Sequence, residues 1–310
     1  MDSTKKIVKK LAGDTAGTAA WATNVRKEHG QVLTTVLTSH EGTGLVDMAS
    51  SLMKRYRDAM DPPPRVIYMD RDCCSLTGSS SVAKLFHEWE DVTIVRLDVW
   101  YLMRWFASPV TTESHQLYGA FMSGLSGCIF VWEAGDVTRL REAKRLFGLS
   151  DDQVELRITK KELAKHCRSR TRGAEETTWL IRQLTDTFKG HKGSDTMGIP
   201  LLDRGRIEAV WQSQKRHLIC IQDLDEEQLY TKVRQLVKGG VTLPVYHCAR
   251  GSTSLESFHL HLNNFIQGTS ANGMHLQVYL LEGLVRWNEN RAIAAIKGEK
   301  AARDRSHCRH

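Results

Sequence analysis

Short apolar runs that favour β-strands alternate with helically spaced apolar residues along the first hundred positions. Residues 20–26 and 31–38 are two β-favouring runs, and the turn between them contains Gly30, so they predict a β-hairpin. Residues 7–11 fit either a strand or a short helix. In residues 45–56 the apolar positions recur at helical spacing and predict an amphipathic helix.

A second group of elements follows a triple proline, which would stop that helix. Residues 66–69, VIYM, form a short apolar run that predicts a buried strand ending at Asp70. Three serines can then cap a helix over residues 82–89. Residues 92–97 predict another strand, which ends at Asp98, and a helix begins near Trp100.

From about residue 105 the pattern becomes mostly helical. Amphipathic faces predict helices over residues 137–147, 180–188 and 225–237, with a loop at 190–198. A short extended segment, 241–246, comes next.

The last part of the chain predicts two more helices, over residues 255–266 and 276–287. The predicted fold is therefore α/β, with a core in two segments, 1–105 and 247–295. A mostly α-helical insertion covers 106–246, and a charged, mobile tail covers 296–310.

Composition limits the functional classes. The 310 residues are 41% hydrophobic and 25% charged, enough to bury a core, and no apolar run could span a membrane. The N-terminal residues lack the apolar centre of a signal peptide, so secretion is not expected. Seven irregularly spaced cysteines favour a reducing compartment. A net charge of +7 weakly favours a polyanionic partner.

Candidate chemistry begins with carboxylates at the ends of predicted elements. Asp70 and Asp72 follow a buried strand, where α/β folds place ligands, although Asp70 could equally cap the next turn. Glu256 lies in the first turn of a predicted helix. Thr253 and Glu256 also have the spacing of a capping box, which would give the glutamate a structural role. If Asp70 and Glu256 converge, their oxygens suit Mg²⁺ or Mn²⁺.

Four segments carry a resemblance to a known family: DSTKKIVKKL, YMDRDCC, LDVWYLMRW and CARGSTSLESFH. In this order they resemble the segments of Mutator-like DDE transposases, and of transposase-derived proteins in animal genomes. The resemblance covers Asp2 to about Arg291, and the order of predicted elements is also that of an RNase H-like domain.

The resemblance implies an RNase H-like core that binds two divalent ions, Mg²⁺ or Mn²⁺, and cleaves and transfers DNA strands. Asp2, Asp70 and Glu256 match the three metal-binding acids. The implied partner is DNA, with no membrane and with a homo-oligomer as an option. The implied location is the nucleus, or otherwise the cytoplasm.

Asp2 directly follows Met1, so its strand would have to form where chain ends fray. The start resembles a truncated copy, which would leave the domain inactive. The alternative function is therefore a domesticated module that binds DNA or protein without catalysis. Nuclease assays of Asp70→Asn and Glu256→Gln would separate the two functions.

Further residues carry weaker expectations. Asp72, Asp98 and Arg250 could support the metal ligands, although Asp98 could instead cap a helix. Basic side chains of the insertion could track a DNA backbone or form a solvated helix face; they are Arg139, Arg141, Lys144, Arg145, Lys160, Lys161 and Lys165. Zinc is not favoured, because His217 with Cys220, His247 with Cys248, and the tail residues His307, Cys308 and His310 lack a Cys-x-x-Cys pair.

Overall fold

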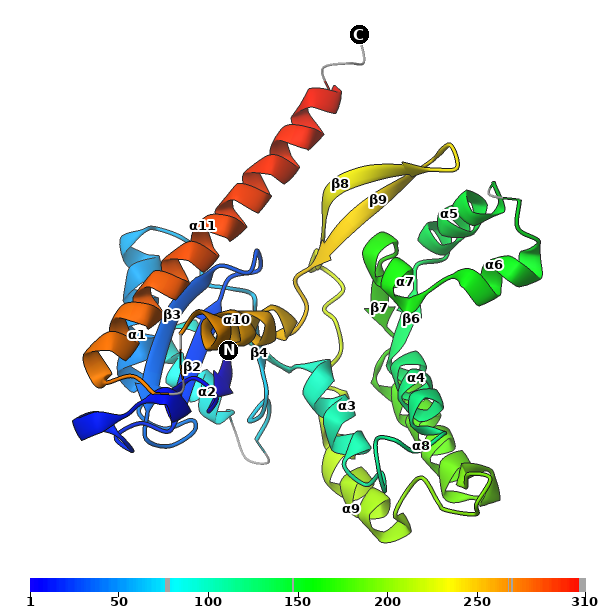
Figure 1. The fold of residues 1–310 in the computed structure, drawn as a ribbon, viewed down its shortest axis with the longest axis horizontal. Helices are drawn as coiled ribbons and strands as arrows, with labels where there is room; N and C mark the ends of the chain where they lie inside the picture. Colours follow the sequence, from blue (N-terminus) through cyan, green and yellow to red (C-terminus); the bar gives the residue numbers. More distant parts are fainter. Residues whose placement is uncertain (76–78, 147, 267, 269, 307–310) are drawn as a thin grey trace. The chain divides into compact units, whose positions relative to one another are not determined.

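The computed structural model describes residues 1–75, 79–146, 148–266, 268 and 270–306 (Figure 1). The fold is mixed α/β with small sheets. The chain divides into two compact units: unit 1 is Met1–Asp98 with Ala249–Lys297, and unit 2 is Val99–Cys248 with Gly298–His310. Within the described residues, none of the helices combines the length and apolarity needed to cross a membrane.

Unit 1 begins with a three-stranded antiparallel sheet. Strand β1 (Asp2–Thr4) pairs with β2 (Trp21–Arg26), which pairs with β3 (Val32–Thr38). The predicted hairpin is therefore confirmed. Residues 7–11, left open between strand and helix, contain the 3₁₀ turn η1 (Val8–Lys10); a second turn, η2 (Gly13–Thr15), follows.

The second sheet of unit 1 contains the two strands that end in aspartates. Strand β4 (Val66–Met69) pairs in parallel with β5 (Ile94–Leu97). Both strands were predicted from their apolar runs, although β5 begins two residues later than expected. The backbone nitrogen of Met1, next to β1, donates a hydrogen bond of 2.7 Å to the carbonyl of Tyr68 in β4. This bond joins the first sheet to the second.

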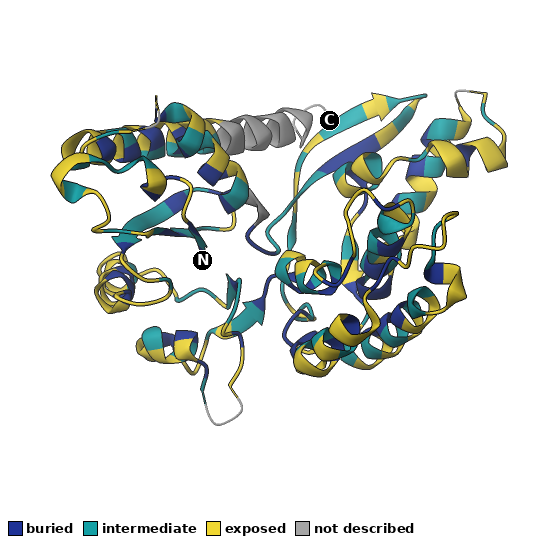
Figure 2. Cartoon of the chain, turned by 60° about the horizontal axis from the view of Figure 1, so that its bottom comes forward, coloured by how far each residue is buried: buried dark blue, intermediate teal, exposed yellow. Residues whose placement is uncertain are grey.

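Helices pack against both faces of strand β3. One apolar cluster combines α1 (Val46–Asp58), α2 (Ser81–Leu85) and the 3₁₀ turn η3 (His87–Trp89). The other cluster combines α10 (Thr253–Phe265) with α11 (Gly273–Ser306). Adjacent residues of β3 point to opposite sides, because Val36 packs against the first cluster and Leu37 against the second. The resulting stripes of buried residues are visible in Figure 2.

One local prediction for unit 1 has a clear outcome. The serine cap is confirmed, since the Ser80 hydroxyl accepts a hydrogen bond of 3.1 Å from the backbone amide of Ala83. Of the residues expected to form a mobile tail, 296–306 belong to helix α11, and their mobility stays a prediction. Residues 307–310 lie outside the described residues.

Unit 2 is mainly helical. Its helices are α3 (Val99–Ala107), α4 (Tyr118–Ile129), α5 (Ala134–Arg145), α6 (Asp151–Arg157), α7 (Lys160–His166), α8 (Ala174–Lys189) and α9 (Arg204–Gln214). The 3₁₀ turns η4 (His191–Gly193) and η5 (Lys215–Leu218) lie among them. Short strands β6 (Phe130–Trp132) and β7 (Ser169–Thr171) pair antiparallel. Helices α4 and α8 pack closely, with the Phe121 and Phe188 rings 5.3 Å apart.

One helix prediction in unit 2 is wrong. Residues 225–237 were expected to be helical, but Tyr230–Lys238 is strand β8, paired antiparallel with β9 (Val241–Cys248). Gly239 and Gly240 connect the strands, and both have positive φ angles, 55° and 79°. Two consecutive residues with positive φ form the tight turn that suits a two-residue hairpin. The glycine pair therefore decides the structure of a segment whose apolar spacing also fits a helix.

Candidate metal centre

Asp2 lies in a formed strand instead of a frayed chain end. It pairs directly with Asn24 of β2, and only 1% of its surface is exposed. One carboxylate oxygen, Oδ1, accepts a hydrogen bond of 2.8 Å from the backbone amide of Ser3. The condition set for Asp2, that its strand forms, is therefore met, since cross-strand pairing on one side and the Met1 bond on the other hold it.

Asp70 immediately follows β4, as expected, and the charge of Asp2 affects its pKa. Burial first, and the negative charge of Asp2 second, raise the pKa of Asp70 to about 6. The side chain of Asp70 is 13% exposed, and the Arg71 guanidinium lies 3.8 Å from its carboxylate. The electrostatic effect of Asp2 on Asp70 indicates that the ends of β1 and β4 bring two carboxylates into one neighbourhood.

Glu256 approaches Asp2 from α10, together with His259. Ligand atoms of Asp2, Glu256 and His259 all lie within 4.8 Å of one another. Asp2 and His259 are buried, and Glu256 is partly buried. Burial lowers the pKa of His259 below its ordinary value, an effect that the nearby charge of Asp2 opposes. These residues could hold a metal ion, because two carboxylates and a neutral imidazole are common ligands.

A polar pair on the sheet holds the histidine in place. The Asn24 side-chain nitrogen lies 2.9 Å from Nε2 of His259. On its other side, the Asn24 side-chain oxygen accepts a hydrogen bond of 2.8 Å from the Thr35 hydroxyl. Asp2, Asn24 and Thr35 are opposite one another on β1, β2 and β3. The sheet thus presents one row of polar side chains towards α10.

The turn before α10 is fixed by Asp98, at the end of β5. The Asp98 carboxylate accepts hydrogen bonds from both the backbone amide and the hydroxyl of Ser252, at 2.5 and 2.6 Å. The Arg26 guanidinium donates to the carbonyl of Gly251 in the same turn. Asp98 therefore supports the helix that carries Glu256.

The capping-box alternative for Glu256 stays a prediction. The N-cap residue of α10 is Ser252, one position before the threonine that the box requires, and its side chain makes no cap hydrogen bond. The Ser252 hydroxyl is instead bonded to Asp98.

Asp72 and Arg250 have different surroundings. Asp72 is exposed, has a positive φ of 54°, and acts on Asp70 through its charge, which helps to raise the pKa of Asp70. Arg250 is partly buried in the segment between β9 and α10. Both residues are near candidate ligands in the sequence.

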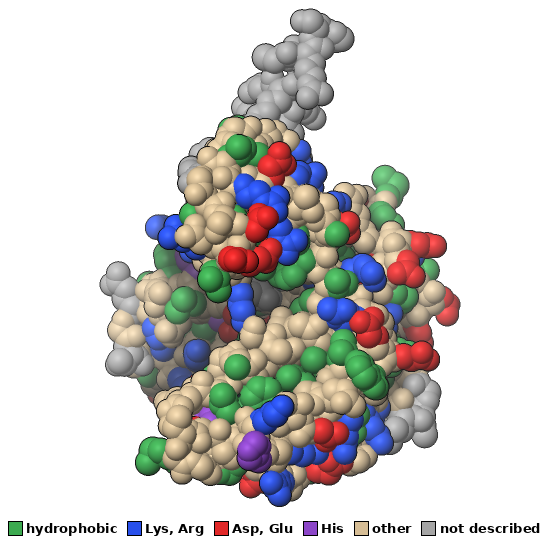
Figure 3. Space-filling model, turned by 90° about the vertical axis from the view of Figure 1, so that its right-hand side faces the viewer, with side chains coloured by type: hydrophobic (Ala, Val, Ile, Leu, Met, Phe, Trp, Pro, Cys, Tyr) green, Lys and Arg blue, Asp and Glu red, His purple; other side chains and the backbone are tan. Residues whose placement is uncertain are grey.

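The predicted basic surface is partly neutralised within unit 2. Ion pairs join Arg139 to Asp136, Arg141 to Glu155, Lys144 to Glu162 and Arg145 to Asp151. The remaining three lysines, 160, 161 and 165, lie on α7. Figure 3 shows one face of the molecule, on which basic and acidic side chains are interspersed. Four of the seven residues in the predicted DNA-contacting set therefore already have acidic partners.

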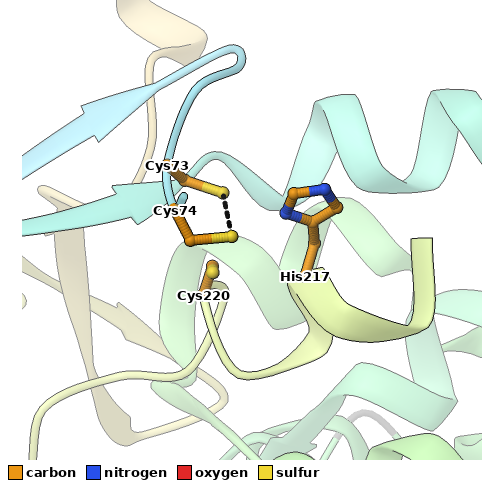
Figure 4. Close-up of side chains that lie close together, drawn as sticks. All are labelled: Cys73, Cys74, His217 and Cys220. Carbon is orange, nitrogen blue, oxygen red and sulfur yellow. Dashed lines mark hydrogen bonds between the residues drawn. The ribbon is translucent and has the colours of Figure 1, made fainter. Parts of the chain in front are cut away.

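Each unit contains a pair of side chains that are potential metal ligands: two thiols in unit 1, and an imidazole with a thiol in unit 2 (Figure 4). In unit 1, Cys73 is buried, Cys74 is exposed, and their sulfur atoms are 4.0 Å apart. In unit 2, His217 lies in η5 and Cys220 follows it, both buried. A structural zinc site takes four such ligands, and each unit by itself brings two into these pairs. His307, Cys308 and His310 lie outside the described residues.

Sequence reasoning nominated Asp2, Asp70 and Glu256 but missed His259 and Asn24. A usable signal for His259 was present, because Glu256 and His259 are three residues apart and share one face of a helix. No sequence signal pointed to Asn24, whose role depends on the pairing of β1 with β2.

Comparison with known proteins adds no assignment: no family model matches the chain, and neither the curated proteins nor the solved structures contain a match. Any functional conclusion therefore depends on the residues and their geometry.

Proposed function

We propose that unit 1 is the core of a divalent-metal-dependent domain that cleaves and transfers DNA strands, of the RNase H-like, transposase-derived type. The observation that carries the proposal is the proximity of Asp2 and Glu256. Their ligand atoms lie within 4.8 Å of one another, although the two residues are 254 positions apart in the sequence. The charge of Asp2 helps to raise the pKa of Asp70, which would supply a third carboxylate. Convergent carboxylates of this kind suit Mg²⁺ or Mn²⁺.

The strand pairings support the proposed core. The antiparallel order β1-β2-β3, the parallel pair β4-β5 and the Met1–Tyr68 bond would together give one sheet in the order β3-β2-β1-β4-β5. In that order Asp2 would lie on the central strand and Asp70 at the end of its neighbour. The ends of central strands are where α/β folds commonly bind ligands.

The roles of the protein groups follow from their positions. Asp2, Asp70 and Glu256 would bind the ions, and the ions would activate a water or a 3′-hydroxyl and stabilise the leaving oxygen of a phosphodiester. Asp98 and Arg26 would keep α10 in register with the strands, because both bond to the turn before it. The lysines of α7 would contribute phosphate contacts. A DNA substrate would imply a nuclear location.

A cleavage assay tests the proposal. End-labelled duplex and single-stranded DNA are incubated with the full chain in Mg²⁺ or Mn²⁺, and with Asp70→Asn and Glu256→Gln variants. Each substitution should reduce cleavage by at least about a hundredfold, since it removes a charged ligand. Glu282→Gln is the matched control, because Glu282 pairs with Arg286 on α11. Cleavage that persists in both site variants would reject the metal site, whereas metal-independent DNA or protein binding without cleavage would favour the non-catalytic alternative.

A further inference from the structure

The candidate metal centre contains a nitrogen ligand that a purely carboxylate site does not need. His259 follows Glu256 by three residues on α10, and 3% of its surface is exposed. Its ligand atom and those of Asp2 and Glu256 lie within 4.8 Å of one another. Ligands bound to one cation at about 2.1 Å are necessarily within about 4.2 Å of each other, so only a small adjustment would be required.

The surroundings of the imidazole fit a metal ligand. Metal-binding histidines almost always form a hydrogen bond through the ring nitrogen that does not bind the metal. Nε2 of His259 is within 2.9 Å of the Asn24 amide, which Thr35 holds from its other side. An amide can present either its oxygen or its NH₂ group, and the Thr35 hydroxyl can either donate or accept. With its amide oxygen turned towards the ring, Asn24 can therefore accept a hydrogen bond from the Nε2–H group and leave Nδ1 as the ligand atom.

We propose that Asp2, Glu256 and His259 bind one divalent cation of the borderline class, such as Mn²⁺ or Zn²⁺, in preference to Mg²⁺. Imidazole nitrogen suits these transition ions, whereas Mg²⁺ prefers oxygen ligands. The inference deepens the proposed function and rests on it for the use made of the cation in cleavage. Cation binding itself is measurable in a protein that cleaves nothing.

The first experiment uses the unmodified full chain. After removal of metals with a chelator, the protein is titrated with Mn²⁺, and the bound ion is examined by electron spin echo envelope modulation. Modulation from ¹⁴N is expected, because an imidazole nitrogen would be directly bonded to the ion. A bound Mn²⁺ without ¹⁴N modulation, or no binding of either Mn²⁺ or Zn²⁺, would overturn the proposal.

The second experiment assigns the nitrogen to one residue. His259→Gln should weaken Mn²⁺ binding by about tenfold or more and abolish the ¹⁴N modulation, while Mg²⁺ binding should change less. His275→Gln is the matched control, because His275 is exposed on α11 of the same unit. If His259→Gln folds and retains both the Mn²⁺ affinity and the ¹⁴N modulation, the assignment to His259 is wrong. If the variant does not fold, the first experiment, on the unmodified protein, still tests whether a nitrogen ligand binds the ion.

The two proposals fail separately. Nitrogen-coordinated Mn²⁺ in a chain that does not cleave DNA would refute the proposed function and preserve this inference. Cleavage could instead depend on metal, Asp70 and Glu256 but be unchanged in His259→Gln, with bound Mn²⁺ that shows no ¹⁴N modulation. That result would support the proposed function and refute this inference.

Discussion

Asp98 holds Ser252 by two hydrogen bonds, to its backbone amide and its hydroxyl, and so connects the end of β5 to the start of α10. The two residues are 154 positions apart in the chain. Both are buried, with 4% and 2% of their surfaces exposed, so water cannot replace the bonds easily. The helix that carries Glu256 and His259 is therefore positioned by a carboxylate that is not itself among the clustered ligands.

Removal of the Asp98 carboxylate should destabilise unit 1. We expect Asp98→Ala to lower the free energy of unfolding by about 3 kcal/mol, because it leaves two buried donors of Ser252 without their charged acceptor. Ser252→Ala should cost about 1 kcal/mol, since the backbone bond remains. Urea unfolding measures both values. Asp91→Ala, at an exposed position, is the control; an Asp98→Ala protein as stable as this control would contradict the positioning role.

Gly251 should not tolerate a side chain. Its φ is +71°, and an added Cβ would lie 2.9 Å from one Asp98 carboxylate oxygen and 3.0 Å from the other. Gly42→Ala is a matched control, because Gly42 has φ +74° but nothing within 4 Å of an added Cβ. Gly42→Ala should cost about 1 kcal/mol from backbone strain alone, and Gly251→Ala at least about 2 kcal/mol. Equal losses in urea unfolding would show that Asp98 does not constrain this turn.

Glu162 gives unit 2 a stability that depends on pH. Burial would raise the pKa of Glu162, but hydrogen bonds from Lys144 and Thr159 outweigh it and hold the pKa at about 2, below the ordinary value of 4.5. A lowered carboxyl pKa contributes stability above the unfolded value, and that stability is lost as pH falls from about 4.5 to about 2. At neutral pH the contribution is on the order of 1 kcal/mol, because water screens the charge of this partly exposed group.

Glu162→Gln isolates this charge, because glutamine can still complete the capping box that Glu162 forms with Thr159. The variant should be less stable than the unmodified protein at pH 7, and the difference should shrink to roughly half by pH 3. Chemical unfolding at several pH values measures it. Glu155→Gln, which removes an exposed ion pair with Arg141, should have little effect at either pH. A constant Glu162→Gln penalty from pH 7 to pH 3 would contradict the assigned cause.

Local sequence patterns predicted much of unit 1 and less of unit 2. The hairpin of β2 and β3, the strands before Asp70 and Asp98, and the Ser80 cap each depend on neighbouring residues, which the sequence displays directly. The helix prediction failed for residues 230–238 because the apolar spacing there fits both a helix and a strand. The Gly239–Gly240 turn that decides between them lies outside the segment.

The candidate site was predictable residue by residue only for its acids. Asp2, Asp70 and Glu256 were nominated through a resemblance, and the proximity of Asp2 to Glu256 is a property of the folded unit. Asn24 contributes because it is opposite Asp2 in a register that no local pattern specifies. His259 contributes because the face of α10 that carries Glu256 is turned towards this sheet. Both depend on long-range packing, which single-sequence reasoning does not reach.

Cation binding should stabilise unit 1, because the folded site brings together ligands that the unfolded chain keeps far apart. At a cation concentration one hundred times the dissociation constant, the gain is about 2.7 kcal/mol. Thermal unfolding with and without Mn²⁺ measures it against a chelated sample. Glu256→Gln should abolish the gain, and Asn24→Ala should reduce Mn²⁺ affinity by about tenfold, because it leaves the His259 ring without its hydrogen-bond partner.

The control for this stabilisation is Glu282→Gln, which changes a carboxylate of the same unit that pairs with Arg286. It should respond to Mn²⁺ as the unmodified protein does. A Glu256→Gln protein that is still stabilised by Mn²⁺ to the same extent would place the cation elsewhere. The stabilisation could instead be lost in Glu256→Gln and unchanged in Asn24→Ala. Glu256 would then still be assigned as a ligand, but Asn24 would have no orienting role, because the His259 ring would bind the cation without support from the sheet.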